Sequence, residues 1–522
     1  MDFELNFFYW FLSFIPIVAV LTLIMAFRWS GGKSGAFSWF TAAFIGYFFF
    51  GANLKVLAVA SLKGLWTTIF ILYIIWGAMA LYNIVAKIDG FEVIASTFTG
   101  LTGETKVLQL LVISWGFVSL LQGVAGFGTP VAVAAPLLVG LGFNPVIATS
   151  AALLGRAWAV TFGSLGSSYA ALLKMTSLDP GGLAFWSSIF LTIVCIVTGL
   201  SISFMYNGKK GLKKGAPAAL IIAISMGSTL IITANFILPY IASLVAGLVG
   251  MGVGTLVLPK TKWYNNNPVK QVEKENKMSF HTAFAPYYTL LILAFGIYLT
   301  PLKSILSKFQ IGLSFPGTET TLGVVNEATA SYSPISLFTT PGTLVFLSVI
   351  IAIIYFMKSG LWKKNYGREV VGSLIKQAIP STVTVMTMSM MAVVMMETGM
   401  TSFLAKGTAE IASNIFPGVS PFIGILGAFM TGSNTSSNIV FAAFQKDVAV
   451  FLGINSLIIA SLQTTGGAIG TIISPMNVAL GTGVTKIVGR EGEIIRKTII
   501  YVIIMGLSIG IPALFLIYYL GI

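Results

Sequence analysis

Long apolar runs alternate with short polar loops along most of this chain. Nine runs have few or no charged residues, and each is close to the roughly 20 residues that an α-helix needs to cross a bilayer. They cover residues 6–27, 64–86, 183–206, 216–235, 237–258, 282–299, 343–357, 378–396 and 498–520. A signal peptide or a single anchor does not account for so many runs. We therefore predict an all-α polytopic protein embedded in membrane lipid, with roughly 12–14 membrane segments.

The Lys and Arg residues gather in the loops between these runs. Four loops are richest in them, at residues 207–215, 260–277, 358–368 and 486–497. Because short cytoplasmic loops carry an excess of Lys and Arg, we place all four in the cytoplasm. Alternation around them then puts the connection at 55–63 and both termini outside the cell membrane. It also requires residues 106–179 to run from inside to outside and residues 406–486 to run the opposite way.

These two oppositely oriented segments resemble each other. LGFNPVIATSAALLGRAW (141–158) aligns without a gap with LGINSLIIASLQTTGGAI (452–469), and AGFGTP aligns with TGSNTS after a five-residue offset. Similar segments of opposite orientation are typical of inverted-topology repeats in secondary transporters. We predict a first repeat over 1–206, two connecting spans with basic cytoplasmic loops over 207–281, and a second repeat over 282–522. The hairpins or broken helices of the two repeats are expected near 107–178 and 415–486.

Both segments contain residues that a lipid-facing helix avoids, because Gly weakens a helix and Pro lacks a backbone donor. The first break is expected at Gly126, Phe127, Gly128 and Thr129, and the second at Ser433, Asn434, Thr435 and Asn438. The N-terminus of a half-helix carries about half a positive charge and free N–H groups. Two such ends aimed at one point form an anion site. The alternative is that the glycines only allow helices to pack closely.

Arg156 is the one charged residue between Lys106 and Lys174, so we predict that it lies deep in the membrane. A guanidinium group holds a carboxylate with two parallel hydrogen bonds. Arg156 is therefore a candidate clamp for a substrate carboxylate. The alternative is a structural role, in which Arg156 bonds to backbone carbonyls or to a membrane acid such as Asp447.

Two further sets of residues are candidates for hydrogen bonding to substrate and for carrying protons. Gln463, Thr464 and Thr465 offer neutral donors for a substrate hydroxyl group, or bonds between helices. Asp447 and Glu397 are the acids expected to be most shielded from bulk water. A shielded carboxyl group changes protonation closer to neutral pH, so both are candidate proton carriers. The alternatives are a solvated turn for Asp447 and a helix end on the outer surface for Glu397.

The composition excludes several classes of protein. One Cys and one His leave no basis for a disulfide framework, a zinc site or a haem held by two histidines, so we expect no metal and no cofactor. The formal charge of +14 is accounted for by the cytoplasmic loops, so we expect no nucleic-acid partner. No pair of membrane acids is spaced for catalysis, and we therefore expect no enzyme activity.

Four stretches, in this order, resemble signature segments of the L-lactate permease family: AGFGTPVAVAAPLLVGLGFNP, GSNTSSNIVFAAFQ, TTGGAIGTIISPMNVALGTG and GREGEIIRKT. The resemblance extends over essentially the whole chain. It implies a carrier of the cell membrane that takes up lactate, and often glycolate, with protons. Distant kinship with dicarboxylate/sodium symporters implies that Ser433, Asn434 and Thr435 hold carboxylate and cation, with residues 126–130 at the symmetry-related place. The same kinship implies elevator-like movement and a homodimer.

These observations together predict a secondary active transporter that imports L-lactate and related 2-hydroxy monocarboxylates such as glycolate together with protons. A co-transported proton cancels the charge of the anion. The alternative is a sodium-coupled carboxylate symporter, because hydroxyl and carbonyl oxygens near residues 433–435 are also suitable ligands for Na⁺. A channel fits less well, since inverted repeats with broken helices are typical of alternating access.

Overall fold

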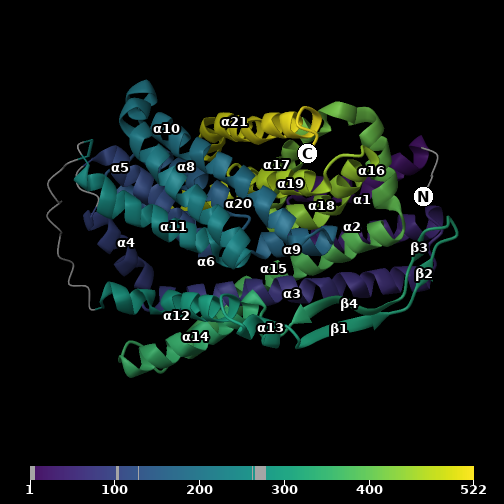
Figure 1. Cartoon of the computed structure of the whole chain (residues 1–522), viewed down its shortest axis with the longest axis horizontal. Helices are drawn as coiled ribbons and strands as arrows, with labels where there is room; N and C mark the ends of the chain where they lie inside the picture. The colour runs from purple at the N-terminus through teal and green to yellow at the C-terminus, as the bar shows by residue number, and fades with distance from the viewer. Residues whose placement is uncertain (1–5, 102–104, 127, 262, 265–277) are drawn as a thin grey trace.

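A computed structural model describes residues 6–101, 105–126, 128–261, 263–264 and 278–522 of the chain. Most helices run along the long axis of the molecule (Figure 1). Within the described residues, eleven helical segments are long and apolar enough to cross a membrane, and they include all nine predicted runs. One of them contains α10 (Pro180–Ile232), which bends at Asn207 and Gly208 and so holds two of the predicted runs. The chain is a multi-pass membrane protein.

One group of helices is built around two long helices that pack along each other, α3 (Leu54–Lys87) and α15 (Tyr366–Glu397). We call it the outer group. Its other helices are α1 (Phe7–Met25), α2 (Gly31–Phe49), α4 (Gly90–Leu101), α12 (Phe280–Tyr298), α13 (Leu302–Leu306), α14 (Pro341–Lys358) and α16 (Met400–Ala412). The helix α2 was not among the predicted runs, because Gly, Ser and Lys dilute its apolar residues.

The inner group contains both segments that were predicted to hold breaks. The first consists of α5 (Lys106–Leu111), η1 (Val112–Phe117), α6 (Val118–Val124), α7 (Thr129–Gly140), α8 (Pro145–Arg156), η2 (Ala157–Ala159) and α9 (Ser167–Thr176). The second consists of η7 (Ser413–Ile415), α17 (Phe416–Thr431), α18 (Asn434–Phe451), α19 (Ser456–Gly470) and α20 (Pro475–Val484). The group also contains α10, η3 (Thr233–Ile237), η4 (Pro239–Ile241), α11 (Ala242–Gly252), η5 (Val253–Val257), η6 (Leu258–Lys260) and α21 (Glu491–Tyr518).

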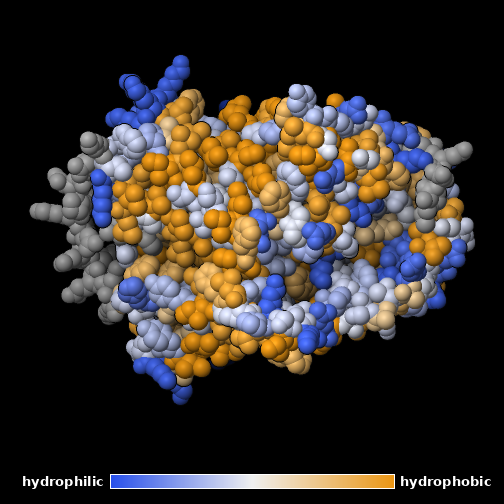
Figure 2. Space-filling view, in the orientation of Figure 1, coloured by the Kyte–Doolittle hydropathy of each residue, from blue (hydrophilic) through white to orange (hydrophobic). Residues whose placement is uncertain are grey.

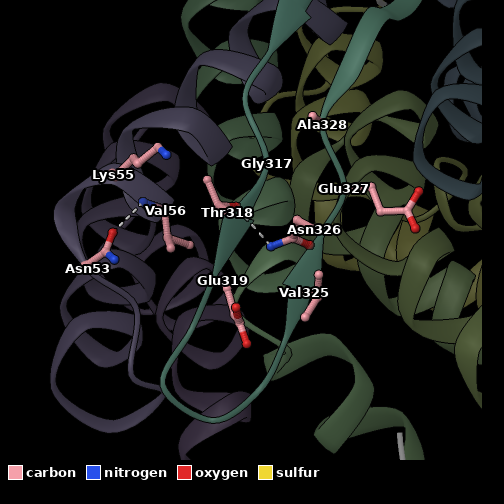
Figure 3. Close-up of a pocket in the computed structure, with 10 residues that line it drawn as sticks. All are labelled: Asn53, Lys55, Val56, Gly317, Thr318, Glu319, Val325, Asn326, Glu327 and Ala328. Atoms are coloured by element: carbon pink, nitrogen blue, oxygen red, sulfur yellow. Dashed lines mark hydrogen bonds between the residues drawn. The ribbon is translucent and has the colours of Figure 1, made fainter.

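A small β region, which the apolar runs did not predict, lies between α13 and α14. The strand β1 (Gln310–Phe315) pairs antiparallel with β4 (Thr329–Ser336), and β2 (Thr318–Glu319) pairs with β3 (Val325–Asn326). The β2 and β3 strands form one wall of a crevice opposite the start of α3 (Figure 3). The indole N–H of Trp66 on α3 donates to Tyr332 O at 2.9 Å, so the β region is tied to the outer group.

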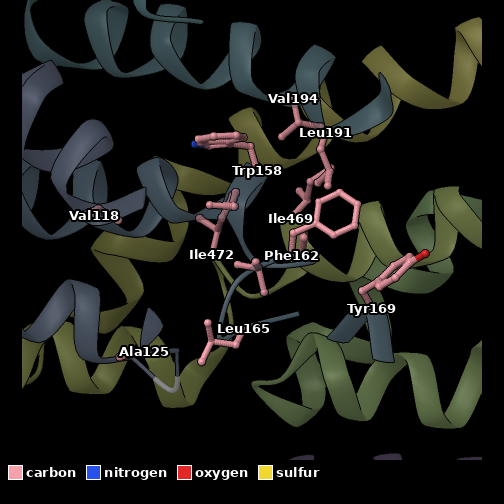
Figure 4. Close-up of a cluster of buried hydrophobic side chains, with 14 of the residues drawn as sticks. Val118, Ala125, Trp158, Phe162, Leu165, Tyr169, Leu191, Val194, Ile469 and Ile472 are labelled. Carbon is pink, nitrogen blue, oxygen red and sulfur yellow. The ribbon is translucent and has the colours of Figure 1, made fainter. Parts of the chain in front are cut away.

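Apolar side chains surround the unwound chain between η2 and α9 in the inner group. Trp158, Phe162 and Tyr169 lie with Ile469 and Ile472 of the second segment around the unwound chain (Figure 4). Trp158 is fully buried, and its indole N–H donates to the Ser119 hydroxyl at 2.9 Å. The interior around the unwound backbone is thus packed rather than open, which fixes the positions of the polar groups described below.

The surface agrees with a membrane location. Hydrophobic residues cover most of the face seen in Figure 2, and hydrophilic residues gather toward the two ends of the molecule and along its lower edge. Two of the predicted basic loops lie close together, since Tyr264 OH donates to Lys214 O at 2.5 Å. In water such large exposed apolar areas would promote aggregation, whereas lipid tails solvate them.

Candidate functional site

The first predicted break is the tip of a hairpin. The helix α6 ends at Val124, and α7 begins at Thr129 after Gly128 takes a left-handed backbone with φ of 85°. The helix α7 then runs back along η1 and α6. At the base of the hairpin, Lys106 Nζ donates to Leu141 O at 2.9 Å. Both ends of the hairpin therefore lie at the same end of the molecule.

The second predicted break is also a hairpin tip. The helix α17 ends at Thr431, and Gly432 is left-handed with φ of 72°. Ser433 caps the returning helix α18, since its hydroxyl oxygen accepts from Ser436 N at 3.2 Å. The helix α18 packs along α17. A left-handed glycine thus lies at each tip, where a residue with a Cβ atom is disfavoured.

Each returning helix is followed by a turn of the same construction. In the aligned stretches, Gly142 and Gly453 are both left-handed. Asn144 and Asn455 both cap the next helix, each accepting from the N–H two residues further on, at 2.9 and 3.0 Å. The aligned residues of the two turns therefore have the same structural roles, a left-handed glycine followed by a helix-capping Asn.

The helix after each turn is broken as well. In the first segment, α8 and η2 give way to unwound chain, and α9 begins only at Ser167. Ser164, Leu165 and Gly166 are consecutive left-handed residues with φ of 48°, 53° and 69°. A non-glycine residue in this region costs about 1–3 kcal/mol and persists only where its surroundings hold it there. In the second segment the break lies between α19 and α20.

The first hairpin tip packs directly on the first broken helix. Ser164 N donates to Gln122 O at 2.7 Å, and Leu165 N donates to Gly123 O at 3.0 Å. A Cβ atom on Gly126 would overlap the Ser164 hydroxyl. These bonds hold the left-handed residues in place, and the close approach explains why Gly126 lacks a side chain.

The second tip meets the first broken helix through hydroxyl and amide groups. Asn438 Nδ2 donates to Ser168 O at 2.9 Å and to Thr464 Oγ1 at 2.8 Å. The hydroxyl groups of Thr435 and Ser168 lie 3.1 Å apart, and Asn434 Nδ2 is 3.4 Å from Thr464 Oγ1. All these side chains are buried. We call the following set the polar cluster: Thr161, Ser167, Ser168, Asn434, Thr435, Asn438 and Thr464.

Arg156 connects the first segment to the second. It is 2% exposed, and its Nη1 donates to Asn477 Oδ1 at 3.3 Å. Asn477 Nδ2 in turn donates to Gly432 O at the second tip, also at 3.3 Å. Within the described residues Arg156 has no acidic partner and its Nε has no hydrogen bond. Asp447, the alternative partner, pairs with Lys446 at 3.2 Å.

The comparison with known protein families is decisive. A model of the L-lactate permease family matches residues 10–520. The chain belongs to the L-lactate permease family. The resemblance of the four signature stretches is thereby confirmed.

Individual permeases resemble the chain over most of its length. It is 29% identical to the glycolate permease GlcA of Escherichia coli K12, with 96% of this chain and 94% of that protein covered. It is 29% identical to the L-lactate permease of Salmonella typhi, with 86% and 84% covered. For the L-lactate permease of Halalkalibacterium halodurans the identity is 25%, with 94% and 93% covered.

A solved transporter structure shares the fold of this permease. The crystal structure of the Alcanivorax borkumensis YdaH transporter, whose topology is described as unusual, matches with a TM-score of 0.50. It covers 89% of this chain and 88% of that protein at 14% sequence identity. The likeness at this identity is one of fold alone.

Several residues predicted for the permease site lie outside the polar cluster. Gln463 belongs to a separate amide network, because its Nε2 donates to Ser437 Oγ at 3.0 Å and its Oε1 accepts from Gln445 Nε2 at 2.5 Å. The Thr465 hydroxyl donates to Ser461 O in its own helix at 2.8 Å. Phe127 lies outside the described residues.

The two acids predicted as proton carriers lie away from the hairpin tips and are paired. Asp447 is 13 residues along α18 from the tip residue Asn434, which corresponds to about 20 Å of helix. Glu397 is at the end of α15 in the outer group, where Lys63 Nζ lies 2.8 and 3.1 Å from its two oxygens. Each acid thus has a cationic neighbour.

Sequence reasoning missed the partners that the permease fold brings to the predicted residues. Thr161 and Ser168 reach the polar cluster from the first broken helix, and Asn477 reaches Arg156 from the second. One signal was present, since GSLGSSYA and SPMN place small polar residues inside apolar segments as the predicted tips do. Their pairing depends on contacts between residues hundreds of positions apart.

Proposed function

We propose that this permease is a secondary active transporter that imports L-lactate and glycolate together with protons across the cell membrane. The observation that carries the proposal is the convergence of two hairpin tips and two broken helices on buried polar groups, with an Arg that lacks an acidic partner among the described residues. Broken helices at such a point are the usual binding site of secondary transporters. The names of the permease relatives support the substrates. The basic loops support a topology with both termini outside.

In the proposed site, two groups of residues bind different parts of the substrate. The Nε atom of Arg156 has no hydrogen bond among the described residues. The planar guanidinium group of Arg156 can therefore hold a substrate carboxylate with parallel hydrogen bonds. The polar cluster offers hydroxyl groups on Thr435 and Ser168 that suit the 2-hydroxyl group of lactate or glycolate. Gly126, Gly128 and Thr129 at the first tip complete the proposed site.

The matched hairpins, turns and broken helices support an inverted-topology repeat. We propose its boundaries at 1–206 and 282–522, with the two connecting spans between them. In this arrangement the inner group carries the substrate, and it moves against the outer group as in an elevator. A homodimer is part of the same proposal.

Charge balance is the reason for proposing proton coupling. Moving one lactate anion inward against an inside-negative potential of about 100 mV costs about 2.3 kcal/mol, and a co-transported proton cancels this charge. Coupling then requires that binding of the proton and binding of the substrate favour the same conformational state of the carrier. Asp447 and Glu397 remain the candidate carriers.

One observation favours a second candidate function, sodium-coupled carboxylate symport. The Oδ1 atoms of Asn434 and Asn438 are buried in the polar cluster and have no hydrogen-bond partner among the described residues. Amide and hydroxyl oxygens are the ligands that hard cations prefer. A sodium ion at this place would satisfy both amide oxygens.

Uptake of labelled L-lactate into proteoliposomes tests the proposal. We expect an inward proton gradient to drive accumulation, and an inward sodium gradient at equal pH to have no effect. Accumulation that needs sodium would instead assign the oxygens of Asn434 and Asn438 to a cation. No uptake under either gradient would contradict the proposed substrate.

The polar cluster can be tested by removing one hydroxyl group. We expect Thr435→Val to raise the KM for L-lactate about fivefold, since a neutral hydrogen bond contributes about 0.5–1.5 kcal/mol. Thr498→Val is the matched control, because the buried Thr498 hydroxyl bonds to Ile494 O in its own helix at 2.9 Å. Equal KM values for the two variants would remove Thr435 from the site.

The proton carrier can be separated from the substrate site by comparing accumulation with exchange. We expect Asp447→Asn to abolish proton-driven accumulation of L-lactate while exchange of internal for external lactate continues. Glu397→Gln is measured in parallel as the other candidate. If Asp447→Asn accumulates L-lactate normally and Glu397→Gln does not, Glu397 is the proton carrier. If both variants accumulate L-lactate normally, neither acid is the proton carrier.

A further inference from the structure

A cavity of about 630 Å³ lies between the inner and the outer group, apart from the polar cluster. One wall comes from the end of α9 and the start of α10, including Lys174 and Ser177. The opposite wall comes from α12, β4 and the start of α14, including Tyr298 and Thr340. Ser177 is exposed at the surface. The cavity is several times larger than a small carboxylate needs.

Among the described residues that line this cavity, Lys174 is the one that is charged. Its Nζ lies 4.8 Å from the centre of the Phe70 ring, and no described acidic residue forms an ion pair with it. Lys63, by comparison, is paired with Glu397. A half-buried ammonium group without a counterion attracts anions into the space that it faces.

The rest of the lining supplies hydroxyl groups. More than half of the lining residues are Ser, Thr or Tyr. The Thr340 hydroxyl is buried, with the residue only 3% exposed, and it has no hydrogen-bond partner among the described residues. An unpaired buried hydroxyl group is costly and is relieved by a ligand that bonds to it. One cation among hydroxyl groups matches a small anion that carries a hydroxyl group of its own.

The floor of the cavity adjoins the first broken helix. Tyr240 lines the cavity and packs on Gly166, where a Cβ atom would overlap its ring. The rings of Tyr240 and Tyr169 meet edge to face with centroids 5.7 Å apart. Ser167 and Ser168 of the polar cluster follow Gly166 directly. The Tyr240 ring therefore connects the lining of the cavity to the chain that leads into the polar cluster.

The crevice beside the β region provides a contrast. It measures about 430 Å³ and also has a lysine, Lys55, in its lining. Glu319 and Glu327 line the same crevice (Figure 3). Two carboxylates outweigh one ammonium group, so this crevice repels an anion.

We propose that the cavity around Lys174 is a capture site for small 2-hydroxy carboxylate anions, from which substrate passes Tyr240 to the polar cluster. The direction in which substrate moves, from the cavity to the polar cluster, rests on the proposed function as an importer. The ammonium group of Lys174 attracts the carboxylate, and the hydroxyl groups of Thr340 and its neighbours take over bonds that the anion made with water.

Transport kinetics test the capture site. We expect Lys174→Gln to raise the KM for L-lactate about tenfold with kcat unchanged, because the variant loses the charge that attracts the carboxylate. Lys174→Arg keeps the charge and is expected to stay close to the wild type. Lys55→Gln is the matched control and is expected to leave the KM unchanged. An unchanged KM in Lys174→Gln would overturn the proposal.

A binding measurement distinguishes failure of the capture site from failure of the proposed function. Cys195 is fully buried, so Ser336→Cys, which lines the cavity, introduces an accessible thiol group. We expect L-lactate, but not chloride at equal ionic strength, to slow alkylation of this thiol by N-ethylmaleimide, and Lys174→Gln to abolish the protection. Protection without transport would contradict the proposed function and keep the anion site. Transport without protection would overturn the capture site alone.

Discussion

Replacing Arg156 by Gln is expected to lower kcat/KM for L-lactate uptake by about a hundredfold or more, the range found when one partner of a buried charged pair is removed. Gln can keep a hydrogen bond to Asn477 Oδ1, which Arg156 Nη1 reaches at 3.3 Å. It cannot supply the charge or the free Nε. The measurement is the concentration dependence of uptake into proteoliposomes.

Two controls separate a role in binding from a role in folding. Arg490→Gln changes an exposed Arg that pairs with Glu493, and we expect normal uptake. L-lactate is expected to raise the melting temperature of the wild-type protein but not that of Arg156→Gln, because a ligand stabilises only a state that binds it. An unchanged apparent affinity in Arg156→Gln would remove Arg156 from the site. A collapse of the fold in detergent would assign it a structural role.

The second large effect concerns stability. Lys63→Met is expected to lower the free energy of unfolding by about 3–5 kcal/mol, because it leaves Glu397 as an uncompensated buried charge. The pair is well shielded, with side-chain exposures of 3% for Lys63 and 13% for Glu397. It also holds the β region in place, since Asn326 Nδ2 donates to Glu397 O at 2.9 Å and Lys63 Nζ lies 5.4 Å from the centre of the Tyr332 ring.

Cys195 is a built-in reporter for this measurement. It is fully buried, so we expect it to react with a fluorescent thiol reagent only when the protein unfolds on heating. The double variant Lys63→Met/Glu397→Leu is expected to recover most of the lost stability, because an apolar pair needs no counterion. Arg490→Gln breaks an exposed pair and is expected to change stability by about 1 kcal/mol or less. If Lys63→Met lowers the free energy of unfolding by no more than Arg490→Gln does, the buried pair does not stabilise the protein as expected.

The local backbone at the hairpin tips and turns depends on residue types that can be read in the sequence. The left-handed tips at Gly128 and Gly432 and the matching caps at Asn144 and Asn455 follow from residue types that favour those conformations whatever their surroundings. The gap-free alignment of 141–158 with 452–469 includes the left-handed glycine and the capping Asn of both turns. The β region was missed, because its short strands carry no long apolar run.

The charged residues were harder to place. Lys63 was expected in a connection outside the membrane, yet it lies within α3 and is buried against Glu397, 334 residues away. The apolar run at 64–86 begins one residue later, so hydropathy alone placed a loop where the helix continues. No local pattern contains the partner that makes a buried lysine tolerable.

The sequence by itself determined that this is a multi-pass membrane protein of the L-lactate permease family, where nine apolar runs of its helices lie, and that two segments are interrupted by Gly and polar residues. These features depend on hydropathy and on local backbone preferences, which neighbouring residues decide. Only the tertiary structure decided which polar groups meet. Asn477 bonds to Arg156, Ser168 lies against Thr435, and Lys174 faces a cavity shared by two groups of helices, because each of these contacts joins segments that are distant in the chain.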